Sequence, residues 1–79
     1  MRYVIAGTRD DRHAPPVMTN RIDPDWKATG PEDEWVEATE QDIARFNAYY
    51  NTFNGFFDAG VHHATARWRA VAAMNAVTA

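Results

Sequence analysis

Short apolar runs separated by turn-forming residues characterise the first half of the chain. The run from Tyr3 to Ala6 contains two β-branched residues and ends at Gly7, which predicts a short strand. Two further short strands are predicted within residues 17–22 and 35–38. Proline and glycine turn signals between them predict irregular surface chain over residues 23–34.

The second half of the chain has the pattern of helices. Thr39 precedes Asp42 by three residues, a spacing typical of a helix start in which the Thr39 hydroxyl accepts a hydrogen bond from a first-turn N–H. The acidic residues there favour the positive end of the helix dipole. A helix is predicted from residue 40 to about residue 54, and a second, alanine-rich helix from about residue 61 to residue 76.

Two arrangements of this helical half are compatible with the pattern. Apolar residues recur at every seventh position from Ile43 to Val71, so a single kinked helix over residues 40–76 is one possibility. The window of residues 54–60 contains two glycines, an asparagine and an aspartate, which are unfavourable inside a helix. The window therefore favours two helices in a hairpin.

These elements predict an α+β fold in one small domain spanning residues 1–79. Two or three short N-terminal strands and an irregular acidic segment occupy residues 1–38 and pack on a C-terminal helical hairpin in residues 39–79. A chain of this size buries only about 60% of its unfolded surface. The absence of cysteine excludes disulfides and Cys-ligated metals, so dense apolar packing or self-association must supply stability.

Aromatic residues crowd the first predicted helix. With Ile43, four of them form a stripe about 80° wide on the helix surface: Phe46, Tyr50, Phe53 and Phe57. Such a stripe indicates the core of the domain. Flanking aromatics widen the stripe, and its edge is a candidate surface for self-association, for example in a homodimer. The candidate residues are Phe46, Tyr49, Phe53 and Phe56. On the second helix, a face with Ala64, Trp68 and Val71 is predicted to pack against the first.

Charge is distributed unevenly along the chain. Residues 23–42 contain eight acidic residues and one basic residue, Lys27, whereas the flanking segments are mildly basic. A negative surface of this kind steers association with a basic partner, and basic surfaces are common on proteins that bind nucleic acid. No basic stripe is present, so direct nucleic-acid binding is not expected. The candidate partner-binding residues are Glu32, Asp33, Glu34, Glu37 and, as an aromatic anchor, Trp35.

Catalysis and metal binding have little support. The chain has neither serine nor cysteine, the two commonest nucleophiles, and no P-loop or dinucleotide-binding motif. The strongest alternative from these classes is a metal site formed by Asp58, His62 and His13, but its spacing matches no known zinc pattern. We therefore expect no catalytic residues, no metal and no cofactor.

The leading hypothesis is a small non-catalytic module that binds a larger protein or protein–nucleic-acid complex through acids that mimic a phosphate backbone. Small, acidic, cysteine-free chains are typical of phage-encoded antagonists of host defence, including anti-CRISPR proteins, so an inhibitor is one form of this hypothesis. The alternative is a structural protein that forms homo-oligomers through the aromatic helix. No targeting segment or membrane-spanning run is apparent, so a cytoplasmic location is expected.

Overall fold

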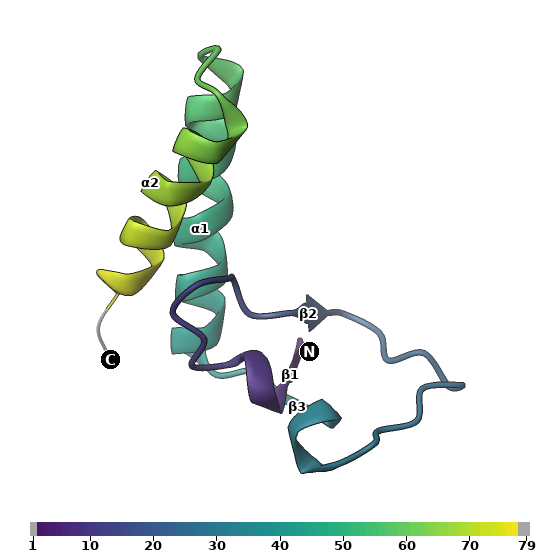
Figure 1. Ribbon diagram of the computed structural model, residues 1–79. Coiled ribbons are helices and arrows are strands. Elements are labelled where there is room, and N and C mark those ends of the chain that lie inside the picture. Colours follow the sequence, from purple (N-terminus) through teal and green to yellow (C-terminus); the bar gives the residue numbers. More distant parts are fainter. Residues whose placement is uncertain (1, 78–79) are drawn as a thin grey trace.

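The protein forms a small sheet at the base of a helical hairpin (Figure 1), as described for residues 2–77 by a computed structural model. This architecture confirms the predicted α+β class and the hairpin. The strands are β1 (Tyr3–Ile5), β2 (Met18–Thr19) and β3 (Trp35–Glu37), and the helices are α1 (Glu40–Asp58) and α2 (His63–Asn75). A single 3₁₀ turn, η1 (Ala6–Thr8), follows β1, and another, η2 (Pro31–Asp33), precedes β3.

The sheet is antiparallel throughout, with β1 in the centre and β2 and β3 at the edges. Val4 lies opposite Met18 on one side and Val36 on the other. Because successive strand residues face opposite sides of a sheet, these three form one apolar face, and Val4 at its centre is completely buried. Ile5 and Trp35 are paired on the opposite face.

The acidic segment before β3 is more ordered than predicted. The prediction of irregular chain is wrong for Pro31–Asp33, which form η2 and pack against η1. A Cβ atom on Gly7 would lie 2.9 Å from the backbone oxygen of Glu32, so only glycine allows the two turns to approach this closely. The Ala6 N–H also donates to the Glu34 carbonyl at 3.0 Å. These contacts hold the acidic segment against the strand end.

Helix α1 begins where predicted and ends later. The Thr39 hydroxyl accepts from the Asp42 N–H, and the Asp42 carboxylate accepts from the Thr39 N–H at 2.8 Å, which completes a capping box. The predicted end near residue 54 is wrong because a glycine at position 55 adds only about 1 kcal/mol to the free energy of a helix. The glycine that ends α1 is Gly60, whose φ of 85° lies in the left-handed region.

Two hydrogen bonds identify the end of α1 as a Schellman motif. The Gly60 N–H donates to the Phe57 carbonyl at 3.0 Å, and the Val61 N–H donates to the Phe56 carbonyl at 3.0 Å. The chain then turns back along α1 as α2, with both helices lying side by side (Figure 1).

The core of the hairpin lies on a different face of α2 from the one predicted. Ala66, Ala70 and Met74 are completely buried, whereas Trp68 is 69% exposed. Tyr49 of α1 packs with Ala70 and Met74. Alanine side chains let the two backbones approach closely, and an indole in their place would hold the helices apart. Ala66, Ala70 and Met74 thus form the packing face of α2, Val71 packs against it, and Trp68 lies outside it.

This packing predicts that two truncations on α2 change the free energy of unfolding by very different amounts. Met74→Ala should lower the free energy of unfolding by about 2–5 kcal/mol, because it leaves a cavity in the hairpin core. Trp68→Ala should change it by no more than about 0.5 kcal/mol, because the indole is exposed. Urea unfolding followed by circular dichroism measures both. A larger loss for Trp68→Ala would contradict the packing.

Candidate functional site

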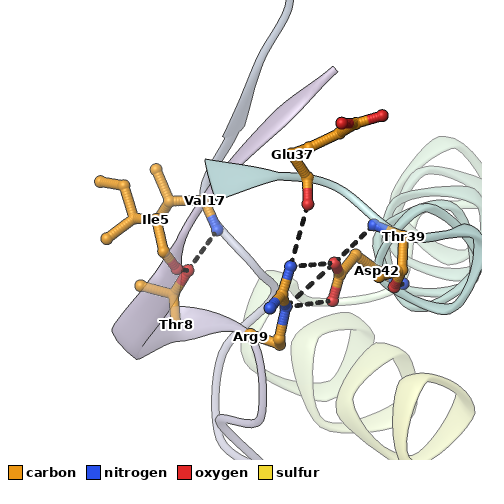
Figure 2. A network of polar contacts seen from close by, with 7 residues as sticks. All are labelled: Ile5, Thr8, Arg9, Val17, Glu37, Thr39 and Asp42. Carbon is orange, nitrogen blue, oxygen red and sulfur yellow. Dashed lines mark hydrogen bonds and ion pairs between the residues drawn. The ribbon is translucent and has the colours of Figure 1, made fainter. Parts of the chain in front are cut away.

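An ion pair between a half-buried arginine and a buried aspartate lies where the sheet, the first loop and α1 meet (Figure 2). The Arg9 guanidinium donates from Nε to both carboxylate oxygens of Asp42, at 3.2 and 3.1 Å, and Nη2 lies 3.0 Å from Oδ2. The same Nη2 donates to the Glu37 carbonyl at 3.1 Å. One arginine from the loop therefore joins the end of β3 to the first turn of α1.

The Asp42 carboxylate stays ionised although it is only 2% exposed. Burial by itself raises the pKa of Asp42, but hydrogen bonds from the Thr39 backbone and from Arg9 outweigh it. The net effect holds the pKa of Asp42 below its ordinary value of 3.8. Asp42 thus belongs to the framework and does not contribute to an exposed acidic surface.

The loop that carries Arg9 is held at further points. The Thr8 hydroxyl donates to the Ile5 carbonyl at 2.8 Å and accepts from the Val17 N–H at 3.0 Å, which closes the base of the loop (Figure 2). Arg45 of α1 donates to the Asp11 carbonyl at 2.7 Å, and Asn75 of α2 donates to the Arg12 carbonyl at 2.9 Å. Polar side chains of both helices therefore fix the loop backbone.

The acidic side chains beside this framework divide into two groups. Asp33 is half-buried and accepts a hydrogen bond from the Thr29 hydroxyl, so it stabilises its own turn. Among residues 2–77, Arg9–Asp42 is the only ion pair, so the exposed carboxylates have no cationic partner. We call these exposed carboxylates the acidic surface: Glu32, Glu34, Glu37 and Glu40.

Two tryptophans lie next to the acidic surface. The predicted anchor, Trp35, is half-buried, and its indole nitrogen is buried without a hydrogen-bond partner. Its ring packs against Trp26, with ring centroids 5.7 Å apart. Trp26 is 43% exposed, and its indole N–H donates to the Asp33 carbonyl at 3.0 Å. The exposed aromatic here is therefore Trp26, which the sequence pattern did not single out because it lies in a turn without periodicity.

The structure divides the candidate self-association residues of α1. Tyr49 is only 7% exposed and belongs to the hairpin core, so it is not accessible to a second copy. Phe46 and Phe53 are half-buried, and Phe56 is 39% exposed. Stacked rings continue from Phe53 to Phe57, which is 55% exposed and is the most accessible aromatic residue of α1. The prediction that Phe57 belongs to the core stripe is therefore wrong.

The histidines do not assemble the alternative metal site. No group of three metal-ligating side chains is close enough to hold an ion within the part of the chain that the structure describes. His62 instead caps α2, because its Nδ1 accepts from the Ala64 N–H at 3.2 Å. Its ring lies 4.4 Å from that of His63, centroid to centroid. His13 lies with His63 beside α2, not with Asp58 and His62.

Comparison with known proteins does not assign the chain to a family. No protein-family model matches it, and no curated protein or solved structure shows significant similarity. Across residues 2–77, neither helix combines the length and the apolar character needed to cross a membrane.

The ion pair predicts a specific loss of stability in acid. The pKa of Asp42 is lower in the folded state than in the unfolded state. Its contribution to the free energy of unfolding is therefore complete above the unfolded-state pKa. That contribution disappears below about pH 4, as the pH falls through the folded-state pKa. At pH 7, Asp42→Asn should lower the free energy of unfolding by about 2–4 kcal/mol, since Arg9 loses its counter-charge. Urea unfolding at a series of pH values from about 2.5 to about 7 tests this. Equal acid sensitivity of wild type and variant would contradict the role of Asp42.

Proposed function

We propose that the protein is a non-catalytic binding module that presents its acidic surface to a basic site on a larger protein or protein–nucleic-acid complex. The observation that supports this proposal is the set of exposed carboxylates without cationic partners, carried on backbone that is hydrogen-bonded in place. Uncompensated like charges on one segment repel one another and so do not stabilise the fold. Their presence on an ordered segment therefore favours a role in recognition.

Order distinguishes this surface from a solvated loop. Glu32 lies in η2 against η1, Glu34 accepts a backbone hydrogen bond from Ala6, and the Glu37 carbonyl is bound by Arg9. A partner therefore meets carboxylates whose backbone positions are already set, and little entropy is lost on binding. Trp26 adds an exposed indole beside the acids, which is the type of side chain that commonly anchors an interface.

A more specific form of the proposal is an inhibitor. Basic sites that accept nucleic acid contact phosphates at regular spacing, and ordered carboxylates compete for such contacts. A phage-encoded antagonist of host defence, of the anti-CRISPR kind, would act in this way in the cytoplasm. By the same reasoning, this surface is not expected to bind nucleic acid, because the surface and the nucleic acid are both negatively charged.

The experiment that tests this function is affinity capture from nuclease-treated bacterial lysate, with identification by mass spectrometry. The bait is the chain, and a parallel bait carries glutamine at positions 32, 34, 37 and 40, which removes charge at nearly constant shape. We expect a nucleic-acid-binding complex on the native bait alone. Added double-stranded DNA should displace it, and raised salt should weaken it by about tenfold or more.

A matched control is Asp58→Asn. It removes an exposed acid at the far end of α1, away from the acidic surface, and should capture the same complex as the native chain. Identical capture by the native bait and the glutamine variant would show that the acids are only a solvated surface, and the proposed function would be wrong.

A second candidate function is self-assembly through the outer end of α1. The exposed rings of Tyr50 and Phe57 favour it, because residues seven apart lie on the same face of a helix and leave apolar surface uncovered there. Phe56, also exposed, lies about 100° to one side of Phe57. No charged residue separates them along the helix.

Self-assembly predicts that the mass in solution depends on concentration. Sedimentation velocity from about 1 to 100 µM, the range of weak dimers, should show a shift toward dimer that Phe57→Ser abolishes. Because Phe57 is mostly exposed, its replacement should leave the unfolding free energy nearly unchanged. A monomer at every concentration would eliminate this candidate.

A further inference from the structure

A second surface of the molecule has the opposite chemical character to the acidic surface. An open cavity of about 420 Å³ lies along the side of α2, and one residue of the first loop, His13, contributes to its lining. Its polar lining consists of three side chains that donate hydrogen bonds: His13 from the loop, and His63 and Arg67 from α2. Its apolar lining is Ala64, Trp68 and Val71.

The polar lining favours an anion. Arg67 forms no ion pair among residues 2–77, and α2 contains no acidic residue. The cavity extends to His63 and Ala64 in the first turn of α2, where the helix dipole adds partial positive charge. Arginine and histidine side chains converging beside a helix start are a donor set suited to the several oxygens of a phosphate group.

The apolar lining favours a planar ring beside that anion. Trp68 is 69% exposed, although burying an indole is among the most favourable changes available to a small protein. The guanidinium of Arg69, which is not part of the cavity lining, lies over the Trp68 ring, 5.5 Å from its centroid. The side chains of Ala64 and Val71 complete an apolar wall.

We propose that this cavity binds a nucleotide, with its phosphate on Arg67, His13 and His63 and its base stacked on Trp68. Stacking of a base on an aromatic side chain contributes about 1–3 kcal/mol and tolerates any base, because every base has a π-face. The cavity volume is at the small end of the range of small-molecule sites and accommodates one mononucleotide. This inference does not depend on the acidic surface or on the function proposed for it.

A free nucleotide is favoured over a nucleic-acid strand. The chain has a net charge of −3, and no basic stripe continues from the cavity to follow a phosphate backbone. A strand that left the cavity would also experience the long-range repulsion of the uncompensated carboxylates. A ligand with one phosphate group and one base satisfies the lining without extending beyond it.

The test is isothermal titration calorimetry of the full chain with AMP, and with adenosine and inorganic phosphate as its separate parts. AMP should bind saturably and at least about tenfold more tightly than either part. Arg67→Gln and Trp68→Ala should each weaken AMP binding by about tenfold or more. Both side chains are exposed, so circular dichroism should show native folding in both variants. Arg21→Gln, an exposed arginine outside the cavity, is the matched control and should bind AMP as the native chain does.

Three outcomes would overturn the inference. The first is the absence of saturable AMP binding up to about 10 mM, weaker than any useful site of this size. The second is equal affinity of the native chain and Arg67→Gln. The third is binding of a ten-nucleotide single strand about a hundredfold more tightly than AMP, which would identify a strand as the phosphate source. Loss of lysate capture in the glutamine variant has no bearing on these outcomes, so the two proposals fail independently.

Discussion

The contact between Arg9 and Asp42 connects two parts of the molecule that share little apolar core. The buried cluster of the hairpin consists of Tyr49, Ala70 and Met74, whereas Val4 is buried within the sheet. Between these two regions, the connection is largely polar. Arg9 reaches the start of α1 and the end of β3 at once, and Arg45 adds hydrogen bonds from α1 to the loop and to the end of α2. A chain of this size gains little from burial alone, so each of these charge-assisted contacts carries more weight.

The same framework explains why opposite charges occupy separate surfaces. Arg9 neutralises the one acid that is buried and leaves the exposed carboxylates within and on either side of β3 unpaired. The loop that Arg9 anchors continues to His13, which lines the same open cavity as Arg67 of α2. One loop therefore supports the backbone beside the acidic surface on one side and contributes His13 to the cavity on the other. Partner binding at the acidic surface and nucleotide binding in the cavity both require that loop to stay in place.

Local signals in the sequence were sufficient for part of this architecture. The Thr39–Asp42 capping box depends on residues three apart, so α1 was predicted to start at the correct residue. The hairpin followed from the glycines around residues 55–60, although only the structure shows that Gly60, with its positive φ, is the one that ends α1. Short apolar runs that end at turn-forming residues placed the strands, because this signal needs only a few neighbouring residues.

Features that depend on distant contacts could not be predicted in the same way. Arg9 and Asp42 are 33 residues apart, and nothing near either residue indicates its partner. The predicted packing face of α2 was wrong. Side-chain size favoured a face with Trp68, but Ala66 and Ala70 allow the two helices to approach more closely on another face. The cavity was missed because His13 and Arg67 meet only in the folded chain. Trp26 lies in a turn, where the sequence has no periodic pattern from which its exposure could be predicted.

A double-mutant cycle on Arg9 and Asp42 tests most directly whether their contact joins the two halves. The free energies of unfolding of the native chain, Arg9→Gln, Asp42→Asn and the double variant are measured by urea unfolding at pH 7 and low salt. The pair should show a coupling free energy of about 1–3 kcal/mol, and the double variant should be less destabilised than the sum of the single variants. A coupling below about 0.5 kcal/mol would mean that the two side chains act independently, and the sheet and hairpin would then be held together by other contacts.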